Sequence, residues 1–455
     1  MILKALKTIR NNWKKSTVIV CVAAYGVNWL NTRMKIDHLM RVYCEEAIEF
    51  GNEPLNPYAA PRHVTVILNP VSKDRKCKQL YEKYVSPLFN CAGIKVSVLQ
   101  TESEGEAKNL MNIMQNTDAV VVVGGLGTVH ESITGLLRRN DSDSISTSLP
   151  IGVIPMSKRN YRFSEIFDFA KLPINESKRL SEVRIIAESA MTIIRETKKT
   201  VDVIKIEGKE IGKPVYAFNG MEFGILNDLV NKVDKYWYFG SYIKPYYSMI
   251  RGTILKNRES LNIPVDVNIS YTEPCNGCSK CYQATKESKT IDESSRRWWH
   301  AFVPRKLGSQ PNSLNLSEPA VDYSSVVNEK CGVWRDLTEK QLLNVAIRNS
   351  VYNRKMQLML HLSDDMKKSE IIREGINLYK NNKLKSAKII EAQNIRIKLA
   401  PNIKQTTNEN ENELENPEDK NKVINNDLWF SIDSERYESQ SVELTLLPRK
   451  VNVYC

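Results

Sequence analysis

One apolar run that ends among closely spaced glycines constrains this chain more than any other feature. Residues 118–125 read DAVVVVGG, and Gly124, Gly125 and Gly127 surround the point where the run stops. Four consecutive valines are typical of a strand that is buried on both faces of a parallel sheet. Residues 129–139 then place apolar side chains at helical spacing. The sequence therefore predicts a strand, a tight glycine turn and a helix within an α/β sheet.

A turn of this kind is suited to bind phosphate. Glycine lets the main chain adopt positive φ and approach a ligand closely. The helix that follows begins with exposed N–H groups and a partial positive charge, and Thr128 adds a hydroxyl. The competing interpretation is a turn that binds nothing, but three glycines within four residues favour phosphate. Because no Gly-Lys-Ser/Thr follows, the motif is not a Walker A loop.

Strands and helices alternate through the first part of the chain. We expect strands at 63–70, 93–100, 118–125 and 151–156, separated by helical segments. This alternation predicts a parallel sheet with right-handed crossovers, and we assign it to a nucleotide-binding lobe at 62–195.

Strand follows strand after a helix at 177–195, which predicts a largely antiparallel β lobe from 196 to 455. Two segments of this lobe look like insertions: 274–330 is polar and contains cysteines, and 404–422 is a charged tract typical of disorder. The predicted fold class is α/β plus β, with a parallel-sheet lobe followed by an antiparallel one.

The first 61 residues resemble a targeting and membrane-association segment. Residues 1–15 contain five basic residues and no acid, with apolar residues at helical spacing, which favours mitochondrial targeting. The apolar run at 17–30 is shorter than the ~20 residues that span a bilayer. A secretory signal peptide and a buried first helix are the second and third interpretations. Nine cysteines, an odd number without a disulfide framework, weigh against the secretory one.

A formal net charge of +12 favours anionic partners. No nucleic-acid-binding module is recognisable, so phosphate and membrane contacts explain the charge better, and we expect no nucleic-acid partner.

Seven aromatic residues between 236 and 247 lie beside Lys235 and Lys244. They are a candidate lipid-facing surface, because amphipathic rings settle at membrane interfaces. In the competing interpretation, the core of the β lobe accounts for at least half of them.

Cys275, Cys278 and Cys281 form a C-x₂-C-x₂-C pattern in the first insertion. Zinc would need a fourth ligand, such as Cys331 or His300. Because no paired second knuckle exists, unpaired thiols in a loop are the favoured interpretation.

Three segments together carry a resemblance to a known family. Residues 124–135 resemble the GGDGTxxExxxG signature of the diacylglycerol kinase and sphingosine kinase catalytic domain. Residues 68–70, Leu-Asn-Pro, resemble its opening strand motif, and 432–435, Ile-Asp-Ser-Glu, resemble its late Asp-Gly-Glu motif. Stretches near both ends, LKTIRNNWKK and FSIDSERYESQSVELTLLPRK, extend the resemblance to the acylglycerol kinase branch of the family.

The resemblance implies an ATP-dependent kinase that phosphorylates the hydroxyl of monoacylglycerol or diacylglycerol, with Mg²⁺ bridging the ATP phosphates. By resemblance, Glu435 is the general base, Asp433 a second catalytic carboxylate, and Asp202 a metal-organising carboxylate. Without the family resemblance, Asp433 and Glu435 would be interpreted as part of a polar turn between two strands. Asp202 would be interpreted as an exposed residue at a strand edge. The residues that would hold the nucleotide are Asn69, Gly124, Gly125, Gly127 and Thr128.

The same resemblance implies acylglycerol lipids and the mitochondrial inner-membrane surface as partners, on the side of the intermembrane space. Members of the acylglycerol kinase branch also serve as a subunit of the carrier translocase of that membrane. Translocase subunits are therefore further expected partners.

Two positions depart from the family pattern. Leu126 stands where the signature has Asp, and Ser157 stands near an expected glycine in the turn at 154–160. Leucine supplies neither charge nor acceptor, and one acid/base group contributes ~10²–10⁴ in rate. The sequence therefore predicts either a weakened lipid kinase or a catalytically impaired scaffold subunit of the translocase.

Overall fold

The computed structural model describes most of the chain and divides it into two compact units. The first unit comprises Met1–Ser132, Asp143–Thr200 and Asn452–Cys455, and the second comprises Ile133–Ser142 and Val201–Val451. The described residues are 12–52, 61–157, 163, 177–208, 212–255, 263, 267–275, 277–280, 325–338, 342–350, 355–362, 367–381, 387–399 and 428–455.

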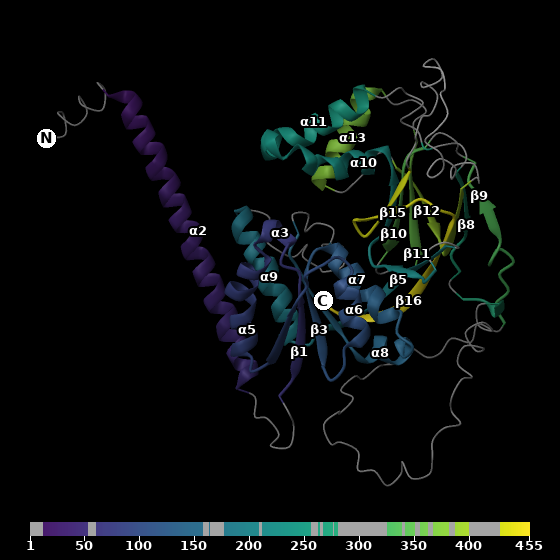
Figure 1. Cartoon of the computed structure of the whole chain (residues 1–455), viewed down its shortest axis with the longest axis horizontal. Coiled ribbons are helices and arrows are strands. Elements are labelled where there is room, and N and C mark those ends of the chain that lie inside the picture. The colour runs from purple at the N-terminus through teal and green to yellow at the C-terminus, as the bar shows by residue number, and fades with distance from the viewer. Residues whose placement is uncertain are drawn as a thin grey trace, which may run out of the picture. The chain divides into compact units, whose positions relative to one another are not determined.

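A parallel sheet forms the centre of the first unit (Figure 1). Its strands follow the order β2-β1-β3-β4, and Val453 near the C-terminus pairs in parallel with Ile151. All six residues of β3 are buried, as four consecutive valines predict. The parallel α/β prediction is therefore confirmed. The strand bounds are β1 (His63–Leu68), β2 (Lys95–Gln100), β3 (Ala119–Gly124) and β4 (Ile151–Pro155).

The helical connection expected between β1 and β2 is not one continuous helix. Lys73, Asp74 and Arg75 all have positive φ, which breaks the helix at its start. The chain then continues through short helical segments. They are α3 (Ser72–Arg75), α4 (Cys77–Leu80), the π-helix η1 (Tyr81–Val85) and α5 (Ser86–Cys91).

The other helices of this region cover the sheet or connect its strands. The long α9 contributes Val183, Ala187 and Ala190 to the core beneath β1 and β3. The bounds are α6 (Glu106–Ile113), α7 (Leu126–Leu137), α8 (Ser142–Ser148) and α9 (Lys178–Ile194).

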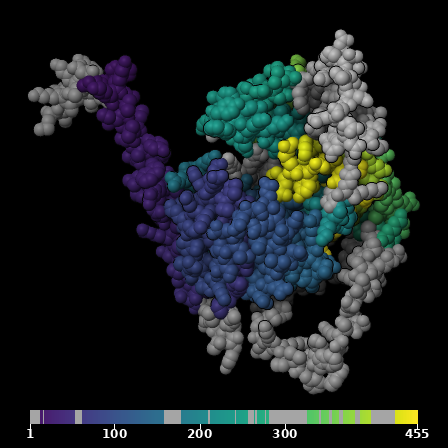
Figure 2. All heavy atoms as spheres, viewed as in Figure 1, coloured from purple at the N-terminus to yellow at the C-terminus, as the bar shows by residue number. Residues whose placement is uncertain are grey.

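Helix α2 (Trp13–Gly51) has two different halves. Ile36, Tyr43 and Ala47 are buried against the sheet helices, and Arg195 binds both carboxylate oxygens of Glu46 at 2.7 and 2.9 Å. The half before Leu30 exposes apolar side chains and stands clear of the rest of the first unit (Figure 2). Among the described residues, no helix combines the length and apolar character needed to cross a bilayer. The basic start at 1–11 lies outside the described residues.

Antiparallel strands dominate the second unit, as predicted. One sheet follows the order β12-β11-β10-β7-β14-β15, and another joins β16, β13, β8 and β9, with β5 and β6 paired beside it. A shared core includes Phe223, Val345 and Phe430. The bounds are β5 (Lys198–Gly208), β6 (Val215–Ala217), β7 (Gly220–Gly224), β8 (Val267–Thr272), β9 (Trp334–Asp336), β10 (Leu342–Ser350), β11 (Lys355–Leu362), β12 (Ala387–Ala392), β13 (Asn394–Leu399), β14 (Trp429–Ile432), β15 (Glu435–Glu438) and β16 (Val442–Tyr454).

The second unit also contains a helical cluster that the sequence pattern missed. Leu229, Val233 and Met249 form its own small core. None of the seven aromatic side chains between 236 and 247 is buried, so assigning half of them to the β core was wrong. The elements are α10 (Ile225–Asn231), the 3₁₀ segment η4 (Lys232–Phe239), α11 (Gly240–Ile254) and α13 (Lys368–Asn381).

Candidate active site in two groups of residues

The turn between β3 and α7 is tied to the ends of two neighbouring strands. Just past β1, the Asn69 N–H donates to the carbonyl of Val123 at 3.0 Å, and its Nδ2 donates to Oγ1 of Thr128 at 3.0 Å. Just past β4, the Met156 N–H donates to the carbonyl of Gly124 at 2.8 Å. Three carboxyl ends of parallel strands therefore meet at one edge, where open α/β sheets bind ligands.

Space explains the glycines of this turn better than backbone conformation does. None of the three described glycines at 124, 125 and 127 has positive φ, so that part of the expectation was wrong. A Cβ at Gly124 would lie 2.8 Å from Oγ1 of Thr128, whereas a Cβ at Gly125 would meet nothing within 4 Å. The first glycine therefore allows close internal packing, and Gly125 leaves open space beside the start of α7.

A lysine from the strained segment after β1 reaches the same edge. Lys73 has φ of 56°, and its Nζ donates to the carbonyl of Ser157 at 3.3 Å and pairs with Glu182 at 3.3 Å. Left-handed conformations of non-glycine residues cost free energy and gather at functional sites. Lys73 thus binds the turn at 154–160, whose residues 158–160 lie outside the described part, while Glu182 balances its charge.

Position 126 supplies packing in place of a ligand. Leu126 is the first residue of α7, and its side chain is only 5% exposed. In the following turn, Glu131 accepts the N–H of Gly105 at 2.9 Å. The open space at Gly125, the amide of Asn69, the hydroxyl of Thr128 and the start of α7 suit the phosphates of ATP. For Mg²⁺ the fit is poorer in this unit, since Leu126 offers no oxygen ligand.

Asp433 is bound by a row of backbone donors within the second unit. Its carboxylate accepts the N–H groups of Phe218, Asn219 and Gly220 at 2.6, 2.8 and 2.9 Å. Its own N–H donates to the carbonyl of Gly220 at 3.0 Å. The side chain is 2% exposed. With φ of 47° at Asp433 and 78° at Ser434, the two residues form the tight turn between β14 and β15. The carboxylate therefore fastens this hairpin to the link between β6 and β7.

Glu435 begins β15 and is more accessible than Asp433. Its side chain is half-buried, and the Tyr437 hydroxyl donates to its Oε2 at 3.3 Å. Burial, followed by the negative charge of Glu435, raises the pKa of Tyr437 above its usual range, so the phenol stays protonated and keeps donating. Of the two predicted catalytic carboxylates, Glu435 is the more exposed one, whereas Asp433 is buried.

Asp202 is buried, so the interpretation of an exposed strand edge was wrong. The residue is 2% exposed, and its Oδ1 accepts the N–H of Arg449 at 2.8 Å. Its carbonyl accepts Nδ2 of Asn349, whose N–H donates to the carbonyl of Asn219 at 3.0 Å. Because the N–H of Asn219 binds Asp433, one hydrogen-bonded chain links Asp202 to Asp433 inside the second unit.

Sequence reasoning missed a buried ion pair on the neighbouring strands. Arg348 on β10 donates to Glu222 on β7 at 3.1 Å, and each side chain is 7% exposed. Two charged residues within otherwise apolar strands were the available signal, but only the β7–β10 pairing shows that they meet.

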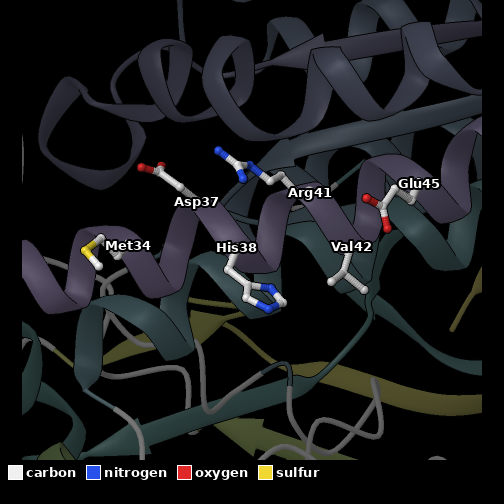
Figure 3. A pocket seen from close by; sticks show the side chains of 6 residues that line it. All are labelled: Met34, Asp37, His38, Arg41, Val42 and Glu45. Carbon is white, nitrogen blue, oxygen red and sulfur yellow. The ribbon is translucent and has the colours of Figure 1, made fainter.

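The predicted residues thus fall into two groups. Asn69, Gly124, Gly125, Gly127 and Thr128 lie in the first unit, and Asp202, Asp433 and Glu435 lie in the second. A separate pocket contains none of them (Figure 3). Its described lining is Met34, Asp37, His38, Arg41, Val42 and Glu45, all from α2.

Part of the chain matches a model of kinase catalytic domains, and a solved structure resembles it in outline. Residues 63–206, which include the glycine turn and strands β1 to β4, match the model of the diacylglycerol kinase catalytic domain. A putative diacylglycerol kinase structure from Bacillus anthracis str. Sterne is 17% identical with a TM-score of 0.46, covering 88% of this chain and 98% of that one.

Full-length relatives show which kinase family the chain belongs to. "Acylglycerol kinase, mitochondrial" of Xenopus laevis is 33% identical, covering 100% of this chain and 95% of that protein. The protein of the same name from Homo sapiens is 29% identical over 99% and 96%. The chain therefore belongs to the acylglycerol kinase family, and by that membership it is a lipid kinase. The family resemblance seen in the sequence is confirmed.

Proposed function

We propose that this chain transfers the γ-phosphoryl group of ATP to the hydroxyl of monoacylglycerol or diacylglycerol, giving lysophosphatidic or phosphatidic acid. The observation that carries the proposal is the turn at Gly125, where open space, a helix start and the Asn69–Thr128 pair converge. The names of the curated relatives support an acylglycerol as the acceptor.

The transfer needs positioning and one proton acceptor. The lipid oxygen forms a bond to the γ-phosphorus, the bond to the β–γ bridging oxygen breaks, and the hydroxyl proton passes to Glu435. Tyr437 holds Glu435 in place through its hydroxyl. Asp433 does not take the proton in this scheme, because three N–H groups already occupy its carboxylate. Bound Mg²⁺ would neutralise phosphate charge, and Asp202 remains the proposed organising carboxylate.

The substrate must come from a membrane, and the second unit offers a surface for that contact. This interfacial surface consists of Trp237, Tyr238, Tyr242, Ile243 and Tyr246 on η4 and α11. Trp237 and Tyr242 are 79% and 90% exposed. Arg251 lies in the same helix and provides charge for anionic headgroups, whereas Lys244 is paired with Asp234 at 2.8 Å. Exposed aromatic and aliphatic side chains beside basic ones are typical of interfacial binding.

Replacing Trp237, Tyr242 and Ile243 together by Ser is expected to lower binding to anionic phospholipid vesicles about tenfold. Burying such side chains contributes ~1.5–3 kcal/mol each when complete, but the exposed apolar half of α2 offers a second contact. Co-sedimentation measures the binding. Ile389→Ser is the matched control, since Ile389 is 57% and Ile243 59% exposed. Equal binding by the triple variant and the control would contradict an interfacial role.

The names of the relatives and the N-terminal sequence support a mitochondrial location. The curated relatives are named mitochondrial, and the basic start of this chain fits mitochondrial import. We place the protein on the inner membrane, facing the intermembrane space. Its second candidate function is a scaffold subunit of the carrier translocase, which Leu126 favours because a scaffold needs no carboxylate there.

Restoring the carboxylate by Leu126→Asp is expected to raise kcat for monoacylglycerol by about 10- to 100-fold, because one acid/base group contributes ~10²–10⁴. Since the site is buried, the new charge should also lower Tm. Phosphate transfer from labelled Mg-ATP measures the rate, and Leu126→Asn controls for lost packing without adding charge. If folded Leu126→Asp gains nothing and the wild type has no turnover above background, the scaffold function is the one that remains.

A further inference from the structure

Three cysteine side chains that take no part in the kinase site meet in the second unit. The Sγ atoms of Cys275, Cys278 and Cys331 all lie within 4.8 Å of one another. Cys278 is fully buried, and the other two are half-buried. None of the three is in a disulfide. The sequence placed two of them in one insertion motif, and the fold adds Cys331 from the far end of the insertion.

The chain segments that carry these cysteines are held together by other contacts. Cys275 and Cys278 follow β8, whereas Cys331 precedes β9, and β8 pairs with β9 so that Thr272 lies opposite Trp334. Glu273 and Arg335 form an ion pair at 2.6 Å across the two strands. Farther out, the Ser279 N–H donates to the carbonyl of Val326 at 2.9 Å. The two cysteine-bearing arms are therefore in place before any ligand binds.

The local backbone also suits thiolates. Gly277 precedes Cys278 with φ of 133°, and Gly332 follows Cys331 with φ of 78°. Such conformations favour glycine and turn the chain sharply beside each sulfur. Nδ2 of Asn328 donates to Sγ of Cys275 at 3.4 Å. Hydrogen bonds of this kind orient the ligand atoms of metal sites.

We propose that Cys275, Cys278 and Cys331 bind a structural zinc ion. Zinc–sulfur bonds of about 2.3 Å in a tetrahedron set the sulfurs about 3.8 Å apart, so thiols within 4.8 Å need only small movements. Soft thiolates select zinc over the hard Mg²⁺ that accompanies ATP. The fourth ligand comes from outside this cluster. Cys281 and His300, which the sequence offers, lie outside the described residues.

The ion would join the two ends of a long segment, since residues 281–324 lie between the cysteine-bearing arms. Closing a long loop is where such a link stabilises a fold most. The site is independent of phosphate transfer, because its ligands flank β8 and β9, whereas Asp433 and Glu435 lie at β14 and β15 of the other sheet.

Metal analysis of the full chain, purified without chelator, tests the proposal. We expect about one zinc per chain in the wild type. Cys275→Ser/Cys278→Ser/Cys331→Ser should contain less than a tenth of that amount. The matched control is Cys44→Ser/Cys91→Ser/Cys455→Ser, which changes three half-buried cysteines elsewhere and should keep its zinc.

A second measurement covers the case in which the triple variant does not fold. Wild-type protein stripped by a chelator and reloaded with Co²⁺ should show the intense thiolate-to-cobalt charge-transfer absorption, which added zinc removes. Wild-type protein without zinc and without this absorption overturns the proposal. So does full zinc content in the folded cluster variant, or a disulfide between any two of the three cysteines under metal-replete conditions.

Discussion

Gly125→Glu is expected to abolish ATP binding and kinase turnover while leaving the first unit folded. A Cβ added at this position meets no protein atom within 4 Å, and Gly125 does not have positive φ. The substitution therefore costs little in the protein itself. It places a carboxylate where we propose that the ATP phosphates lie, so we expect kcat/KM to fall by at least about 10³-fold through exclusion and like-charge repulsion.

The neighbouring glycine supplies the matched control. A Cβ at Gly124 would lie 2.8 Å from Oγ1 and 2.9 Å from Cβ of Thr128, so Gly124→Ala should destabilise the unit by ~1–3 kcal/mol. Thermal unfolding and ATP titration of both variants separate the two effects. The Gly125 variant should keep its Tm and no longer bind ATP, whereas the Gly124 variant should have a lower Tm. If the Gly125→Glu variant binds ATP with wild-type affinity, the nucleotide does not bind at this turn.

The parallel strands of the first unit could be predicted because each is an apolar run with its own stop signal. β3 ends in glycine, and β1 is followed by Asn69 and Pro70. Helix α11 could not be predicted from the local sequence. It contains Pro245 and a dense set of aromatic residues, both of which argue against a helix by propensity. Packing of Met249 on α10 and α13 overrides that local preference.

The candidate site also has one part that the sequence predicts locally and another that depends on contacts between distant residues. The glycine turn is local, so the single stretch 118–128 suffices to predict it. The donors to Asp433 are not local, because Phe218, Asn219 and Gly220 precede it by more than 200 positions. Only the pairing of β7 with β14 brings them together. The meeting of Cys331 with Cys275 depends in the same way on the β8–β9 pairing.

The two acidic residues of the β14–β15 hairpin should respond oppositely to substitution. Glu435→Gln is expected to lower kcat about 10²–10⁴-fold, the usual contribution of a proton acceptor. Its Tm should change little, since the side chain is half-buried and the new amide can still accept the Tyr437 hydroxyl. Steady-state kinetics with monoacylglycerol, combined with thermal unfolding, measures both quantities.

Asp433→Ala should instead destabilise the second unit by ~3 kcal/mol or more. It leaves three backbone N–H groups without their acceptor at a site that is 2% exposed, and each buried unsatisfied donor costs ~1–3 kcal/mol. Asp433→Asn is the sharper variant, because asparagine tolerates the φ of 47° and keeps one acceptor oxygen. If Asp433 acts by fastening the hairpin, the Asn variant should lose both stability and kcat only in part, and its activity should recover at lower temperature. A folded Asn variant of wild-type Tm with kcat as low as that of Glu435→Gln would instead make Asp433 a reacting group, and the proton would then have two candidate acceptors.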